Sequence, residues 1–279
     1  MSSGTSIRLG QLRHAPSGTI LGVAFDHGGS GIPSGGADVE GVCRRLAASN
    51  ADALLLGPGV ASREGDLLAA AGAPRLIVSV DAPVFSALPG KGSHTLEAHC
   101  RLIRIEHAAS LGATAVKVLL PIGRSSAAEL RESMQIVAGV VDEAHVLGIP
   151  VMVEPALWGP LATQDDELIL HSNRVAVELG ADLLKTSAPA SEEALGDLVR
   201  YAPVPVVILG GAARSRKELL GDVARWMAAG AAGVVVGRNV WMSRDPVHVV
   251  DALAKVVHGD DLEGALHVLA KENDGDDGL

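Results

Sequence analysis

Eight short apolar runs recur along the 279-residue chain, and each is followed by a turn residue and a longer segment with helical spacing. The runs are apolar on both faces, as parallel strands covered by helices are. The segments between them, such as 127–148 and 214–231, carry apolar residues at intervals of three and four, which is typical of amphipathic helices. The eight predicted strands are Thr19–Phe25, Ala53–Leu56, Leu76–Val80, Ala115–Leu120, Val151–Glu154, Leu183–Thr186, Val206–Leu209 and Gly233–Val236.

The number and spacing of these units predict the fold. Eight βα units, repeating about every 30 to 35 residues, favour a (β/α)8 TIM barrel, with a doubly wound open sheet as the alternative. No Pro-rich linker divides the chain, so we expect a single domain over 1–279. We expect a short flexible N-terminal segment at about 1–15 and an acidic, disordered C-terminal tail at about 271–279. In such a barrel the chemistry belongs at the C-terminal ends of the strands.

Charge and composition exclude several classes of partner. The formal net charge of -10 argues against sequence-independent binding of nucleic acid, which needs a basic face. No apolar run reaches the ~18 residues that a membrane-spanning helix requires, so we expect no membrane partner and a cytoplasmic protein. The two cysteines, Cys43 and Cys100, lie in stretches that we predict as separate helices, and we expect both to be free thiols.

Two of the six lysines interrupt predicted strands: Lys117 in AVKVLL and Lys185 in LLKT. Burying an ammonium group is costly, because desolvation disfavours the charged form. A lysine whose pKa is lowered by burial and by a second cation becomes an amine nucleophile that can form a Schiff base with a carbonyl. The alternative is that each lysine is structural and paired with a carboxylate.

Carboxylates follow three of the predicted strands. Asp26 comes directly after the first in AFDHGGSG, Asp81 follows the third, and Glu154 ends the fifth. Such groups can transfer protons or hold a lysine, but they can also cap turns or form salt bridges. His27 is either a ligand contact or a packing residue, and Trp158, like Asp81, lies in a strand-end loop where we expect substrate contacts.

The last two strands end in ILGGAARS and VVVGRNVW. Loops at these positions of a barrel commonly bind phosphate through glycine N–H groups, and an arginine can add a bidentate contact. We therefore predict a phosphate site at Gly210, Gly211, Gly237 and Arg238. The ten histidines show no zinc-binding spacing, so we expect no metal and no cofactor. His99 and His107 are predicted to share an exposed helical face.

Three segments resemble a known family. RVAVELGADLLKTS, VPVVILGGAAR and AGAAGVVVGRNVW are similar to the Schiff-base lysine segment and phosphate loops of archaeal-type class I fructose-bisphosphate aldolases and their relatives, including aminodideoxyheptulosonate synthase. AFDHGG resembles the family's Asp-His-Gly segment, and the likeness runs from about Leu21 to Pro246. The resemblance implies that Lys185 forms the imine and Asp26 transfers protons, and that the phosphate ligands are Gly210, Gly211, Gly237 and Arg238.

The chain departs from this family at the fifth strand. Those aldolases usually carry Tyr-Pro-Arg-Gly there, whereas this chain has VMVEPALWGP, and its only tyrosine, Tyr201, precedes the seventh strand. AVKVLL and VMVEP look more like the tagatose-bisphosphate and sulfofructose-phosphate aldolase branch, in which a lysine and a glutamate occupy these strands. Glu154 is the titratable group that this segment offers for the tyrosine's role as acid or base, with Asp26 or a bound water as the alternatives. If Glu154 takes the role, we expect its apolar neighbours to raise its pKa.

The sequence thus predicts a metal-independent class I aldolase that forms a Schiff base with a phosphorylated ketone donor such as dihydroxyacetone phosphate. We expect Lys117 to keep Lys185 neutral, and we expect the protein to be a homo-oligomer. Transaldolase-like or thiolytic transfer on the same lysine is one alternative, and a non-catalytic regulator that binds sugar phosphates is another. The predicted catalytic residues are Lys185, Asp26, Glu154 and Lys117.

Overall fold

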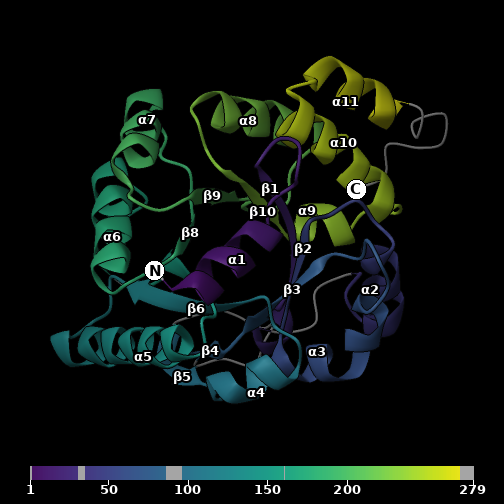
Figure 1. Cartoon of the computed structure of the whole chain (residues 1–279). Coiled ribbons are helices and arrows are strands. Elements are labelled where there is room, and N and C mark those ends of the chain that lie inside the picture. The colour runs from purple at the N-terminus through teal and green to yellow at the C-terminus, as the bar shows by residue number, and fades with distance from the viewer. Residues whose placement is uncertain (1, 31–34, 86–95, 160, 271–279) are drawn as a thin grey trace.

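The computed structural model describes residues 2–30, 35–85, 96–159 and 161–270. Within them, eight parallel strands close into a barrel in the order β1-β10-β9-β8-β7-β6-β3-β2 (Figure 1). The predicted barrel is confirmed and the open-sheet alternative is wrong. The barrel strands are β1 Ile20–Phe25, β2 Ala53–Leu56, β3 Arg75–Ser79, β6 Ala115–Ile122, β7 Val151–Leu157, β8 Leu183–Thr186, β9 Val206–Leu209 and β10 Gly233–Val236.

Helices follow the strands and surround the barrel (Figure 1). Several begin at a serine or aspartate whose side chain accepts a hydrogen bond from a backbone N–H in the first turn, as Ser126, Asp165 and Ser191 do. Ser215 and Glu218 form a reciprocal capping box at the start of α8. The helices are α2 Val39–Ala47, α3 Pro58–Glu64, α4 Ile105–Ser110, α5 Ala127–Val146, α6 Asp166–Glu178, α7 Glu192–Tyr201, α8 Arg216–Ala228, α9 Arg238–Trp241, α10 Pro246–Gly259 and α11 Leu262–Ala270, with single 3-10 turns at His27–Ser30 and Gly65–Leu68.

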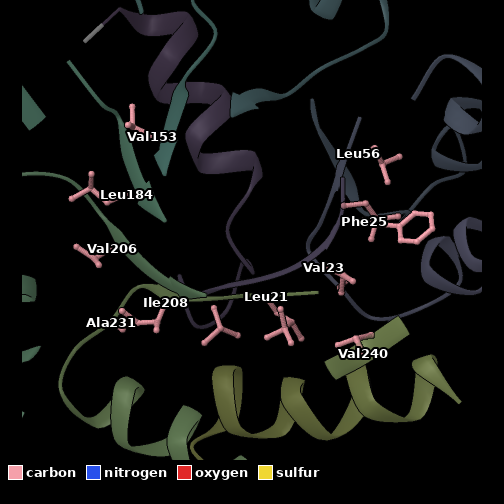
Figure 2. Close-up of a cluster of buried hydrophobic side chains, with 14 of the residues drawn as sticks. Leu21, Val23, Phe25, Leu56, Val153, Leu184, Val206, Ile208, Ala231 and Val240 are labelled. Carbon is pink, nitrogen blue, oxygen red and sulfur yellow. The ribbon is translucent and has the colours of Figure 1, made fainter. Parts of the chain in front are cut away.

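Alternation along the strands separates two cores. Side chains at every second position, such as Ile20, Met152 and Leu183, fill the barrel interior. The intervening residues pack outward into a larger cluster with the helices. Figure 2 shows part of this outer cluster, with Leu21 and Ile208 between the strands and the helices that cover them. Because the period is two, each strand position is assigned to one core or the other.

A further helix, α1 Ser3–Gln11, lies over the centre of the ring of strands (Figure 1). Leu9 of this helix and Leu12 just after it pack into the inner cluster, and Leu12 is fully buried. Residues 1–15, which we expected to be flexible, therefore include a helix that covers the N-terminal end of the barrel. The composition of this segment gave no sign of this role, because only two of its apolar side chains make the contact. The predicted acidic tail at 271–279 lies outside the described residues.

An antiparallel hairpin, β4 Asp81–Phe85 with β5 Leu96–Arg101, is inserted between β3 and α4. Its two ends meet at one residue, because the Val80 carbonyl accepts a hydrogen bond from the Leu102 N–H at 2.8 Å. The expectation of a helix around Cys100 is wrong, and so is the expectation that His99 lies on an exposed helical face: both residues are on β5, and His99 is buried. Cys43 does lie on a helix, α2, and both thiols are free.

Candidate active site

The strand register brings the predicted lysines and glutamate together inside the barrel. Ala115, Met152 and Leu183 belong to the inner cluster. Lys117, Glu154 and Lys185 each lie two positions further along the same strands, so they face the same interior nearer its C-terminal end. A one-residue shift of any of these strands would turn the charged side chain toward the helices.

The four predicted catalytic side chains form one cluster, and none is more than 11% exposed. The Lys185 Nζ donates a hydrogen bond to Glu154 Oε2 at 2.9 Å. The Lys117 Nζ lies 3.3 Å from the same oxygen and 3.4 Å from Asp26 Oδ2. Glu154 therefore bridges the two lysines, and Lys117 bridges the two carboxylates. This arrangement supports a joint role for residues that are up to 159 positions apart in the sequence, as Asp26 and Lys185 are.

The two ammonium groups decide the ionisation of the carboxylates. Burial would raise the pKa of Asp26, but Lys117 and Lys185 lower it to about 2. Burial would also raise the pKa of Glu154, yet Lys185 and Lys117 outweigh it, and the pKa is lowered. The expected rise in the pKa of Glu154 is therefore wrong. The sequence showed its apolar strand neighbours but not the two lysines that reach it from adjacent strands.

Lys117 is held as an ammonium group. Burial would lower its pKa, but Glu154, Asp26 and Asp81 together raise it above the ordinary value. Its Nζ also donates a hydrogen bond to Ser79 Oγ at 3.4 Å. Ser79 is a contact that the sequence analysis missed, although its position, directly opposite Lys117 in the register of β3 and β6, follows from the barrel pairing.

His27 connects the end of β1 with the end of β10. Its Nδ1 lies 3.7 Å from Asp26 Oδ1, and burial is the main reason that the pKa of the ring is lowered. Gly237 leaves room for this ring, because a Cβ at position 237 would lie 2.9 Å from His27 Cε1. His27 is also partly exposed, with 35% of its side chain accessible. It borders both the carboxylate cluster and the predicted phosphate loops.

The predicted phosphate residues lie together in the loops after β9 and β10. Gly211 has a left-handed backbone with φ of 70°. The Arg238 guanidinium lies over this loop and donates a hydrogen bond to the Gly211 carbonyl at 3.4 Å. Gly210 differs from the others, because its N–H donates to the Val235 carbonyl at 3.2 Å. Its part is steric: a Cβ there would lie 2.7 Å from Val236 Cγ1.

Asn239 fastens these two loops together. Its side-chain amide donates hydrogen bonds to the carbonyls of Gly210 and Ala212, at 3.2 and 3.0 Å, and accepts one from the Arg214 N–H at 3.0 Å. The sequence analysis missed Asn239. Its position directly after Arg238 in VVVGRNVW was the available signal, since an amide can donate and accept at once.

Two of the predicted substrate contacts, Trp158 and Asp81, differ in their exposure to solvent. Trp158, just after β7, is 37% exposed and faces Phe85, with ring centroids 6.0 Å apart. The Asp81 carboxylate has no exposed surface, and its Oδ2 accepts hydrogen bonds from His99 Nε2 and from the Leu119 N–H. Its other oxygen lies 4.0 Å from the Lys117 Nζ, so this arrangement points to a structural contact for Asp81 rather than to an exposed one.

With this geometry in view, similarity to known proteins decides the family. The DeoC/LacD family aldolase model matches residues 20–243, which covers the barrel from β1 to just after α9. The chain belongs to this aldolase family. The 2-amino-3,7-dideoxy-D-threo-hept-6-ulosonate synthase of Halobacterium salinarum is 33% identical to this DeoC/LacD family aldolase over 250 residues, which are 88% of this chain and 90% of the relative.

Solved structures agree with this assignment. A Schiff-base-forming fructose-1,6-bisphosphate aldolase superposes with a TM-score of 0.75 and 26% identity, covering 91% of this chain and 99% of the other. The fructose-bisphosphate aldolase from Slackia heliotrinireducens shares the fold, with a TM-score of 0.83 at 19% identity and coverage of 100% and 93%. The protein is a class I aldolase. The family match does not favour transaldolase-like or thiolytic transfer, nor a non-catalytic regulator.

Proposed function

We propose that Lys185 forms an imine with a phosphorylated ketone donor, such as dihydroxyacetone phosphate, and that the enzyme makes or cleaves a carbon–carbon bond beside that imine. The observation that carries the proposal is the 2.9 Å contact between Lys185 Nζ and Glu154 Oε2, inside a buried cluster at the C-terminal end of the barrel. An amine that attacks a carbonyl must first lose a proton, and this contact supplies the acceptor.

Glu154 acts first as a base. It enters the cycle as a carboxylate, since its pKa is lowered, and takes a proton from the Lys185 ammonium. The neutral amine attacks the ketone carbon, and proton transfer from the nitrogen to the new oxygen gives a carbinolamine. Glu154 then returns its proton to the departing hydroxyl group, so that water leaves and the iminium forms. In cleavage, the Glu154 carboxylate takes a hydroxyl proton of the substrate and the carbon–carbon bond breaks. Its electron pair moves into the iminium, so that an aldehyde leaves and an enamine remains on Lys185.

Asp26 and Lys117 keep the charges of the site in place. Asp26, with a pKa of about 2, remains a carboxylate at neutral pH and stabilises the positive iminium on Lys185. Lys117 remains an ammonium group and holds Asp26 and Glu154 on either side of it. Neither needs to change its ionisation during the steps assigned to Glu154.

The loops after β9 and β10 support a phosphorylated donor. Gly211, Gly237 and Arg238 offer backbone N–H groups and a guanidinium close to one another, at the end of the barrel where Lys185 lies. A phosphate bound there would fix the ketone carbon relative to the amine, which removes much of the entropic cost of the encounter. A similar protein, the fructose-bisphosphate aldolase class 1 of Halobacterium salinarum, is named for a phosphorylated sugar, which is in keeping with a phosphorylated donor here.

Trapping tests the proposal directly. Borohydride added in the presence of dihydroxyacetone phosphate should reduce the imine and leave a stable adduct on Lys185, located by peptide mass spectrometry. Lys117→Met, the matched variant, should still form the adduct at Lys185, whereas Lys185→Met should form none. An adduct on Lys117, or the same labelling in both variants, would refute the assignment.

We also infer that the enzyme is a cytoplasmic homo-oligomer that works without metal. Among the described residues, no helix combines the length and apolar character needed to cross a bilayer. In the same part of the chain, no group of three or more His, Cys, Asp or Glu side chains is arranged to hold a metal ion. Light scattering would test assembly, and full activity after dialysis against a chelator would test metal independence.

A further inference from the structure

The hairpin places a buried imidazole behind the catalytic cluster. His99 on β5 donates from Nε2 to Asp81 Oδ2 at 2.6 Å, and the two side chains are 1% and 0% exposed. Neither residue can touch a substrate from this position. A buried carboxylate that a buried imidazole fixes in place needs a reason, because burying such polar groups is favourable only when they are well partnered.

The two oxygens of Asp81 have different surroundings. Oδ2 accepts two hydrogen bonds, from His99 Nε2 and from the Leu119 backbone N–H, each at 2.6 Å. Oδ1 has no hydrogen bond among the described residues and lies 4.0 Å from Lys117 Nζ. Two donors on one oxygen fix the rotation of the carboxylate. They leave the other oxygen aimed at the Lys117 ammonium group.

Lys117 needs this fixed charge when Glu154 changes state. Its ammonium group is faced by Asp26 from the end of β1, Ser79 from β3, Asp81 from β4 and Glu154 from β7. Lys185 on β8 competes for the same Glu154 oxygen. A protonated Glu154 no longer attracts Lys117, whereas the Asp81 carboxylate has no ion pair with Lys185 among the described residues.

We propose that Asp81 and His99 are positioning residues. His99 fixes the carboxylate of Asp81, and Asp81 holds the Lys117 ammonium between Asp26 and Glu154 while Glu154 exchanges protons with Lys185. The part that concerns proton exchange rests on the proposed function. The part that concerns Lys117 rests on geometry alone and can be tested without turnover.

The first experiment measures the lysine itself. The chain has six lysines, so carbon-labelled lysine side chains give few NMR signals, and Lys117→Met identifies the one from Lys117. From about pH 8 to about pH 11, the wild-type Lys117 signal should remain that of an ammonium group, beyond the ordinary lysine pKa of about 10.4. In Asp81→Asn, a nearly isosteric change, the titration midpoint of Lys117 should fall into this pH range. A Lys117 signal that remains that of an ammonium group across the range in both proteins overturns the proposal.

The second experiment separates positioning from a packing role for His99. His99→Gln keeps a donor near the place of Nε2, and His99→Leu keeps similar bulk without a donor. We expect kcat to fall about tenfold or more in His99→Leu with little change in KM, because small displacements of catalytic groups are costly, and to recover largely in His99→Gln. Equal activity of the two folded variants would refute the role of the hydrogen bond.

Borohydride trapping distinguishes this proposal from the one on which it partly rests. His99→Leu and Asp81→Asn should still give the reduced adduct on Lys185 with dihydroxyacetone phosphate. If wild-type protein gives no adduct, the proposed function fails, and the titration of Lys117 still decides the positioning role. If the adduct forms and Asp81→Asn leaves the Lys117 signal unchanged, the positioning role alone fails.

Discussion

At the scale of single residues, the site is a balance of buried charges. Lys117 and Lys185 meet three carboxylates, those of Asp26, Asp81 and Glu154, within salt-bridge distance of at least one ammonium group. Removing one member of such a set leaves a charge uncompensated in a site with little access to water. Substitutions here should therefore be isosteric, so that a lost activity can be separated from a lost fold.

Glu154→Gln tests the proton-transfer role. The amide cannot take a proton from Lys185, so we expect turnover to fall by about 100-fold or more, the usual effect of losing a general acid or base. The imine should still be trapped on Lys185, because the amine can lose its proton to water more slowly. The measurement is carbon–carbon cleavage in parallel with adduct mass. Cleavage at the wild-type rate would assign the role to Asp26 or to water.

Arg238→Ala tests the phosphate loops. A charge-assisted hydrogen bond contributes about 1.5 to 3 kcal/mol, so the KM or Kd for a phosphorylated donor should rise about tenfold or more. A non-phosphorylated analogue such as dihydroxyacetone should be affected much less. Arg200→Ala in α7, an exposed arginine paired with Asp197, serves as the matched control and should leave the donor's affinity near wild type. Equal losses for the two ligands in Arg238→Ala would place the phosphate elsewhere.

Which side chains meet in the site was only partly predictable. Lys117, Glu154 and Lys185 could be identified because a charged residue in an apolar strand is conspicuous and its face follows from the period of two. His99 could not, since its partner Asp81 is supplied by the hairpin. Asn239 had only its place beside Arg238 as a signal, because its partner, the Gly210 carbonyl, lies in the loop after the neighbouring strand. The predicted rise in the pKa of Glu154 was wrong for a similar reason, because the pKa depends on Lys185 and Lys117, which lie on other strands.

At the scale of elements, α1 is a structural addition to the barrel. Leu12→Ala should lower the free energy of unfolding by about 2 to 5 kcal/mol, because it empties a fully buried leucine site in the inner cluster. Turnover should stay near wild type, since the change is at the barrel end opposite the site. Urea unfolding and kcat would be measured together. Ile7→Ala, on the exposed side of α1, should change the stability by about 0.5 kcal/mol or less.

The barrel strands and long helices were predictable, and the hairpin was not. The eight runs are apolar on both faces and regularly spaced, so the pattern does not depend on distant contacts. β5 is short, reads LEAHCR, and has both polar and apolar residues, which fits a helix or a strand equally well. Its partner across the hairpin decides between them, and ten residues between the two strands lie outside the described ranges.

At the scale of the whole molecule, the two barrel ends respond differently to pH. At the N-terminal end, burial raises the pKa of Asp52 to about 6, although its carboxylate accepts the Leu21 N–H at 2.6 Å. His258, 3.4 Å away, has a pKa lowered to about 4 by burial and by His14, so it gives no compensating charge at neutral pH. At this end the pKa of a buried carboxylate is therefore raised, whereas at the other end the lysines lower the pKa of Asp26 and Glu154.

Asp52→Asn tests this difference. A raised folded-state pKa gives stability that is complete below the unfolded value of 3.8 and is lost as the pH rises through about 6. Asparagine resembles the protonated form, so the variant should match wild type near about pH 4 and be more stable near about pH 8, by up to about 3 kcal/mol. Denaturant unfolding of both proteins at the two pH values measures this difference in the free energy of unfolding. If the difference between variant and wild type is the same at both pH values, the raised pKa of Asp52 is contradicted.

The closed base of the β4–β5 hairpin has a consequence for how such enzymes can diversify. Because the chain leaves and rejoins the barrel at the Val80 carbonyl, the segment between is a cassette that can be exchanged without altering the βα repeat on either side. A hairpin from another member of the family, placed between Val80 and Leu102, would replace Phe85 and so change the surface that now contacts Trp158. If Asp81 and His99 hold Lys117 as we propose, a replacement hairpin without this pair would weaken the support of the Lys117 ammonium group, so a change in this wall would also change the catalytic cluster.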